Sequence, residues 1–137
     1  MSARSKARKR ALDVLYEADL REIGARDVLT AALSVPDRPL NQYTIELVEG
    51  VVDHQQRIDE LLGTYSEGWT LERMPPVDRN VLRIGVWELL YADQTPDAVA
   101  ISEAVALVQD LSTGESATFV NGLLARVVTL KQDLGAE

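Results

Sequence analysis

Several residue types and motifs that carry chemistry in other proteins are scarce or missing in this chain. It has no cysteine, which excludes disulfides, thiolate nucleophiles and cysteine-ligated zinc, and fits a reducing compartment. It has one histidine, His54, and neither a P-loop nor a dinucleotide-binding glycine motif. No apolar run approaches the ~18 residues of a membrane span, and none follows the amino terminus as in a secretory signal. We therefore predict a cytoplasmic protein that is not an enzyme and holds no cofactor or metal.

The few residues that could suggest catalysis have ordinary structural explanations. His54 falls between Val51 and Ile58 on the apolar side of a predicted helix. A structural role is favoured there, because no second histidine or cysteine could complete a site. Glu88 also faces the apolar side of its helix, where an unpaired carboxylate would cost several kcal/mol. We predict an ion pair between Glu88 and an arginine of another helix, in preference to a functional acid.

Apolar residues recur at helical spacing almost throughout, and no alternating strand pattern is present, so the predicted fold class is all-α. Helices are expected over residues 3–23, 27–33, 43–65, 78–89, 97–111 and 115–130. A loop over 66–76 divides them into two three-helix subdomains, about 1–66 and 76–134. We expect these halves to pack as one helical bundle, a single domain over 1–137.

Charge is distributed very unevenly along the chain. The first ten residues contain five cations and no acid, although the net charge is −8. Removing those five from the 14 Lys and Arg leaves nine basic side chains against 22 acidic ones, so residues 11–137 carry about −13. This asymmetry indicates a local polyanion site on an acidic body. The cations are Arg4, Lys6, Arg8, Lys9 and Arg10.

The residues that follow these cations favour a docked helix over a disordered, solubilising tail, which is the alternative explanation. Ala7, Ala11, Val14 and Ala18 recur at the spacing of a core-facing helix, and neither Gly nor Pro interrupts 3–23. A positioned helix can hold cations at phosphate spacing, whereas a tail loses entropy when it binds. We therefore expect the cations on the first turns of a packed helix.

The segment Phe119–Val120–Asn121–Gly122 is unusual for the interior of a helix, because Asn and Gly each cost roughly 0.5–1 kcal/mol there relative to Ala. Gly122 permits close backbone approach, and Asn121 offers a donor and an acceptor to a base or phosphate. Phe119 is equally compatible with a core position and with stacking on a base. Tyr16 is similarly divided between the core and a partner surface.

Taken together, these segments resemble the NusB family of bacterial transcription antitermination factors. The resemblance covers roughly residues 4–130, and its pieces occur in the family's order with the family's spacing. They are the basic start running into Ala11-Leu12 and Leu15-Tyr16; Leu47-Val48-Glu49-Gly50-Val51; Trp69 with Arg73-Met74; Val77-Asp78-Arg79 and Val81-Leu82-Arg83-Ile84; Glu88-Leu89; Val99 to Val105; and Phe119-Val120-Asn121-Gly122-Leu123-Leu124.

The resemblance implies a fold of two three-helix subdomains and an RNA-binding function. Family members bind boxA RNA of ribosomal-RNA operons together with NusE, a small-subunit ribosomal protein. The heterodimer joins the RNA polymerase elongation complex with other Nus factors and helps it resist termination. Carried over by position, the RNA-binding residues would be Arg4, Lys6, Arg8, Lys9, Arg10, Glu115, Phe119 and Asn121. Those facing NusE would be Tyr16, Glu72 and Asp78.

Two departures from the family pattern are Ser102, where Asn is usual, and Ala125-Arg126, where an acidic residue is common. Self-association into a homodimer is also open, because an apolar surface reserved for partners can pair with itself. Two alternative functions remain. One is an RNA-binding accessory domain like the amino-terminal part of certain ribosomal-RNA methyltransferases. The other is a protein-interaction module whose basic start is merely solvated.

Overall fold

The structure of this protein is a computed structural model that describes residues 2–135. The described residues form six α-helices and no strand, which confirms the all-α prediction. The ends of the predicted domain, Met1 and residues 136–137, lie outside the described residues. The helices are α1 (Ala3–Arg21), α2 (Ala25–Leu33), α3 (Gln42–Tyr65), α4 (Pro76–Tyr91), α5 (Asp97–Leu111) and α6 (Gly114–Gly135).

Local capping explains where several helices begin and end. Ser2 caps α1 by accepting a hydrogen bond from the Ser5 amide at 3.0 Å, and Asn41 caps α3 by accepting from the Tyr43 amide at 2.8 Å. Glu22 ends α1 in the left-handed conformation, with a φ of 55°. Pro76 begins α4, because proline is favoured in a first helical turn.

Each predicted helix lies within two residues of its observed bounds except at the end of α6, and the structure adds three details. Helix α4 begins at Pro76, so Asp78 lies inside its first turn. Helix α6 continues to Gly135, past the predicted end at residue 130. The predicted 66–76 loop contains a short 3₁₀ helix, η1 (Leu71–Arg73), whose turn is closed by the Met74 amide bonding to the Leu71 carbonyl.

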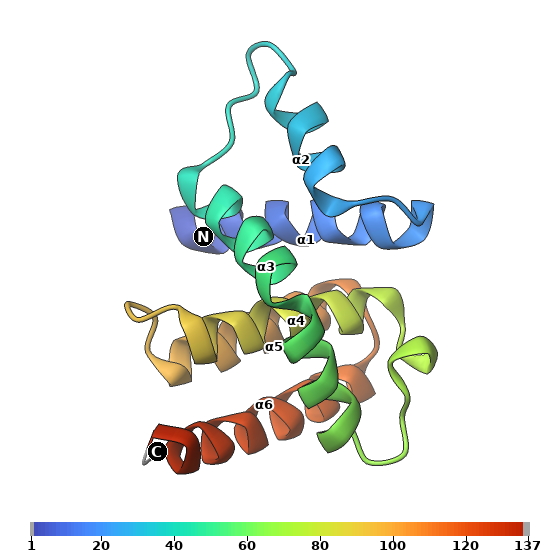
Figure 1. Cartoon of the computed structure of the whole chain (residues 1–137), viewed down its shortest axis with the longest axis vertical. Coiled ribbons are helices and arrows are strands. Elements are labelled where there is room, and N and C mark those ends of the chain that lie inside the picture. The colour runs from blue at the N-terminus through green and yellow to red at the C-terminus, as the bar shows by residue number, and fades with distance from the viewer. Residues whose placement is uncertain (1, 136–137) are drawn as a thin grey trace.

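The long helix α3 connects the two ends of the molecule (Figure 1). It packs on α1 and α2 near its amino end, on α4 along its length, and on α6 near its carboxyl end. Helix α4 contacts α1, α3, α5 and α6, so the core is continuous across the molecule. Division into folding units over about 1–66 and 76–134 stays a prediction.

Two glycines allow α4 to pack closely against its neighbours. A Cβ added at Gly50 of α3 would lie 2.1 Å from Nε1 of Trp87 on α4. A Cβ added at Gly85 of α4 would lie 2.9 Å from Cδ1 of Leu124 on α6. Both distances are shorter than real Cβ contacts, so the absence of a side chain sets the spacing of these helices.

Candidate nucleic-acid interface

The basic start of the chain forms the first two turns of α1, a helix packed on the core through Ala7, Ala11 and Leu15. This confirms the prediction of a docked helix. Arg4 and Lys6 are exposed, and Lys9 and Arg10 are half-buried. Lys9 forms an ion pair with Asp13 at 2.6 Å, and the Arg4 guanidinium lies 4.3 Å from the centre of the Tyr43 ring. Four cations therefore remain at the surface at the amino end of α1.

Arg8 is placed differently from the prediction. Its side chain is 3% exposed, and its Nε and Nη2 donate to Glu88 Oε1 and Oε2 at 2.8 and 2.9 Å. Its Nη1 lies 3.3 Å from Glu103. Burial alone would lower the pKa of Arg8, but the hydrogen bond and charge of Glu88 raise it. The expectation that Arg8 lies at the RNA surface is corrected, because this guanidinium neutralises a buried carboxylate. The predicted ion pair of Glu88 is confirmed.

Further hydrogen bonds tie this ion pair to other helices. The Tyr43 hydroxyl on α3 donates to Glu88 Oε2 at 2.5 Å, and Thr95 lies 3.3 Å from the same oxygen. Burial and the hydrogen bond to Glu88 raise the pKa of the Tyr43 phenol. On α5, Glu103 accepts a hydrogen bond from Ser5 of α1. The amino end of α1 is thereby attached to α3, α4 and α5, which fixes the direction in which its surface cations project.

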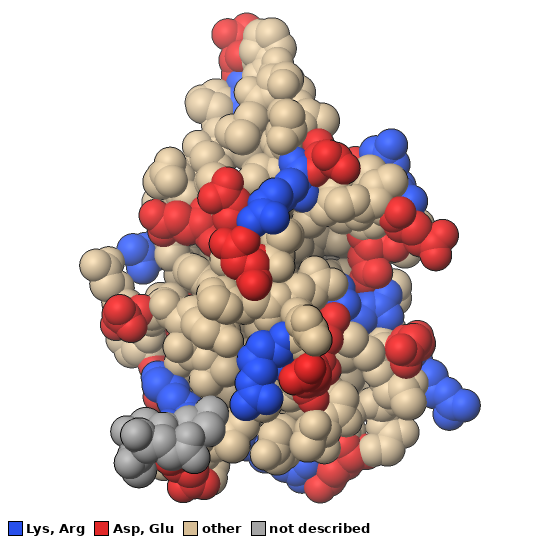
Figure 2. All heavy atoms as spheres, viewed as in Figure 1, with Lys and Arg blue, Asp and Glu red and all other residues tan. Residues whose placement is uncertain are grey.

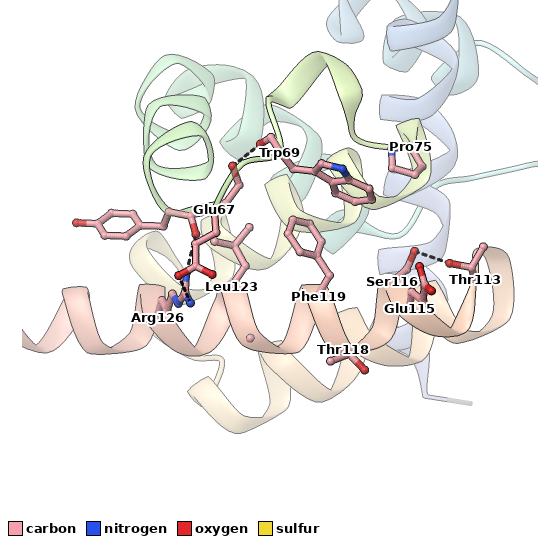
Figure 3. Close-up of a pocket in the computed structure, with 13 residues that line it drawn as sticks. Glu67, Trp69, Pro75, Thr113, Glu115, Ser116, Thr118, Phe119, Leu123 and Arg126 are labelled. Atoms are coloured by element: carbon pink, nitrogen blue, oxygen red, sulfur yellow. Dashed lines mark hydrogen bonds and ion pairs between the residues drawn. The ribbon is translucent and has the colours of Figure 1, made fainter.

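A pocket of about 450 Å³ lies between α6, the end of α3 and the loop that follows α3 (Figure 3). Phe119 is half-buried there, with its ring centre 5.0 Å from that of Trp69 in an edge-to-face arrangement at 72°. Trp69 is 41% exposed. Phe119 thus contacts the core and also presents an edge to the pocket, so it is intermediate between the two predicted roles.

Of the other two α6 residues predicted to bind RNA, only one lines this pocket. Glu115 is exposed and lines it, whereas Asn121 is exposed and is not among the residues that line it. Arg126 forms an ion pair with Glu67 at 2.6 Å at one end of the pocket (Figure 3). A Cβ at Gly122 would meet nothing within 4 Å, so close helix packing does not explain this glycine.

The structure does not bring the two sets of predicted RNA-binding residues together. None of the five basic residues of α1 lines the pocket of Phe119. The amino ends of α1 and α6 lie on opposite sides of the view in Figure 1. On the face shown in Figure 2, basic and acidic side chains are interspersed, without a continuous basic field. A ligand that reaches both sets has to be extended.

The three residues expected to face NusE have different environments. Tyr16 is half-buried and lies outside the core cluster, and Glu72 is exposed on η1. Glu72 lines an open hollow of about 520 Å³ together with Asp59 and Glu60, which makes this surface acidic. Asp78 has no exposed surface, and its Oδ2 accepts a hydrogen bond from Ser116 at 2.6 Å. The expectation that Asp78 faces a partner is corrected, because this carboxylate joins α4 to α6.

Sequence reasoning missed two groups that line these surfaces. In the sequence, Trp69 was only one residue of the family motif, located in a predicted loop. Its exposure and its contact with Phe119 make it a candidate for base stacking. Arg38 lines a hollow together with Lys6 and Arg10. Its only sequence signal is a positive charge between two prolines, which does not say which helix lies nearby.

His54 is half-buried and stacks on the Tyr91 ring, with ring centres 3.8 Å apart. That contact gives it the structural role expected for a boundary histidine. Within residues 2–135, no group of three or more His, Asp or Glu side chains is placed to hold a metal ion. No helix in the same range is long and apolar enough to cross a membrane.

Comparison with known proteins places almost the whole chain in one family. The sequence profile of the NusB family matches residues 5–129. The chain belongs to the NusB family. It is 64% identical to the transcription antitermination protein NusB of Nocardioides sp., over 98% of this chain and 99% of that protein. The corresponding protein of Arthrobacter sp. is 63% identical, over 98% of both chains.

Solved structures of the family share the fold. The structure of T. maritima NusB superposes with a TM-score of 0.82 at 28% identity, covering 94% of this chain and 92% of that one. NusB from a crystal structure of the antitermination factors NusB and NusE in complex with dsRNA gives a TM-score of 0.81 at 27% identity, covering 95% and 98%. The family consists of transcription antitermination factors and not of enzymes, which confirms the non-enzymatic prediction.

Proposed function

We propose that this NusB-family protein is an RNA-binding antitermination factor that recognises boxA RNA of ribosomal-RNA operons together with NusE. The observation that carries the proposal is family membership over residues 5–129, combined with a cluster of surface cations on the amino end of α1. A related NusB has been solved with NusE and dsRNA, which supports the same pair of partners here.

Arg4, Lys6, Lys9 and Arg10 supply the contacts to the RNA backbone in this proposal. They project from a helix that is fixed by the buried pair of Arg8 and Glu88, so little order has to be gained on binding. Phosphate contacts position the RNA without reading its sequence. At α6, Phe119 with Trp69 offers aromatic surface to a base, and Asn121 and Glu115 offer polar groups beside it.

NusE is the second partner in this proposal. Tyr16 and Glu72 contribute to its surface, and Glu72 lines the acidic hollow together with Asp59 and Glu60. Ribosomal proteins are commonly basic, and the net charge of −8 attracts a cationic protein. The complex then joins the RNA polymerase elongation complex and other Nus factors in the cytoplasm. We also propose that the free protein forms a homodimer, whose interface covers part of the surface that faces NusE.

The test is fluorescence anisotropy of boxA RNA titrated with this protein, with and without NusE, alongside a scrambled RNA. We expect boxA to bind more tightly than the scrambled RNA, with a larger difference when NusE is present. If four cations contact phosphates, a fourfold rise in salt lowers the affinity about 50-fold, from a slope of about −0.7 per contact.

Two outcomes would overturn the proposal. Equal binding of boxA and scrambled RNA in the presence of NusE would remove the specific RNA function. Affinity that does not change with salt would remove the role of the basic end of α1, and the protein would then be an interaction module.

A further inference from the structure

The basic side chains of this protein divide into those that already pair with a carboxylate and those that do not. Of the 14 Lys and Arg residues, nine lie within 4.0 Å of a carboxylate. Within the described part of the chain, the other five have no carboxylate partner at that distance. These five are Arg4, Lys6, Arg10, Arg38 and Arg73. In a protein with 22 acidic residues, an external anion can bind these five cations without displacing a carboxylate, whereas at Lys9 it has to compete with Asp13.

Three of those five cations line one hollow of about 420 Å³ between α1 and the start of α3. Lys6 and Arg10 come from one face of α1, four residues apart. Arg38 comes from the loop that connects α2 to α3, and it is exposed. The loop thus carries a third positive charge to the basic helix, from a part of the sequence that is otherwise acidic and apolar.

The base of the hollow is formed by buried residues of two packed helices, and its polar end includes the start of α3. Ala7 and Thr44, both buried, lie at its base, where the Thr44 hydroxyl donates to the Ala7 carbonyl at 3.0 Å. Asn41, the amino-terminal cap of α3, is another lining residue. The amino end of a 24-residue helix carries a partial positive charge that adds to the three cations. Figure 1 shows the start of α3 beside the amino end of α1.

We propose that this hollow binds a phosphodiester group of the RNA, and that Arg38 is a phosphate-binding residue alongside Lys6 and Arg10. The inference rests on the proposed RNA-binding function and extends its surface from α1 to the α2–α3 loop. A guanidinium can bind two phosphate oxygens at once, so Arg38 and Arg10 can hold one phosphate from two sides. The backbone of the RNA then crosses from α1 toward α3 at this point.

The experiment replaces Arg38 by glutamine and measures RNA affinity in the presence of NusE at several salt concentrations. We expect Arg38→Gln to weaken binding about 3- to 10-fold for boxA and for scrambled RNA alike, because a phosphate contact does not read sequence. The slope of log affinity against log salt becomes shallower by about 0.7 to 0.9, the value for one lost phosphate contact.

The matched control is Arg57→Gln, which removes the same charge from an exposed arginine on α3 that pairs with Glu60 at 3.8 Å. It should leave affinity and slope unchanged. If Arg10→Gln weakens binding but Arg38→Gln behaves like Arg57→Gln, the inference fails and the proposed function stands. If neither Lys6→Gln nor Arg10→Gln weakens binding, both are overturned. Circular dichroism and urea midpoints show that each variant is folded.

Discussion

At the scale of single residues, neighbours in one basic run have opposite roles. Arg8 and Arg10 are two positions apart in α1, which turns them to different sides of the helix. Arg8 is 3% exposed and bonded to Glu88, whereas Arg10 is half-buried beside an open hollow. The same residue type therefore stabilises the fold at one position and is available to a ligand at the other.

Replacing Arg8 should be far more damaging to stability than replacing Arg10. Arg8→Ala leaves the Glu88 carboxylate buried without its cation, so we expect the free energy of unfolding to fall by about 3–5 kcal/mol. Arg10→Ala should change it by no more than about 0.5 kcal/mol. Urea denaturation measures the free energy of unfolding of the two variants.

A double variant separates the ion pair from packing. Arg8→Met combined with Glu88→Leu should recover most of the lost stability, because two apolar side chains can replace a buried pair. Equal stability of Arg8→Ala and Arg10→Ala would contradict the buried ion pair.

At the scale of helices, α3 and α4 determine the shape of the molecule. Because Gly50 has no side chain, Trp87 can lie directly against the α3 backbone. Glycine inside a helix costs about 1 kcal/mol relative to alanine, so its presence in the middle of α3 has to be compensated by packing. Trp87 provides that compensation because it fills the space above Gly50.

Two glycines of α3 provide a matched test of this packing. Gly50→Ala puts a methyl group on the Trp87 ring, and we expect it to destabilise the protein by about 1–3 kcal/mol. Gly63→Ala meets nothing within 4 Å and should stabilise it by up to about 1 kcal/mol through helix propensity. Thermal unfolding of the two variants gives the comparison. If both substitutions stabilise the protein, the close packing of Trp87 against Gly50 would be contradicted.

At the scale of the whole molecule, charge separates two kinds of partner. Unpaired cations concentrate at the amino end of α1 and the adjoining loop, whereas the remainder of the chain is acidic. One surface attracts phosphates, and the acidic body attracts a basic protein. In the proposed function, this arrangement would let RNA and NusE bind without competing for the same charges.

The acidic body predicts a salt-sensitive association with NusE. We expect the association rate constant to fall about tenfold or more as salt rises from about 0.05 M to about 0.5 M, because screening removes electrostatic steering. Stopped-flow mixing with labelled NusE measures the rate. Glu72→Gln should lower the rate at low salt and lose its effect at high salt, whereas a rate independent of salt would contradict the charge argument.

The sequence alone determined the positions of the helices and the family. It also determined that Glu88 pairs with a cation. Apolar spacing and capping are local, so the helices predicted over 3–23 and 97–111 agree within two residues with the observed Ala3–Arg21 and Asp97–Leu111. The buried position of Glu88 on its helix face was also local information, and it required a cation. The family motifs occur in linear order, which a single sequence contains in full.

Only the tertiary structure decided which charged groups are available to partners. Arg8 and Asp78 were predicted at binding surfaces, but their burial depends on helices distant in sequence, α4 and α6. Arg38 lies beside Lys6 and Arg10, where its role is proposed, only because the start of α3 folds against α1. Whether a charge is paired depends on distances between segments, and local periodicity carries no information about those distances.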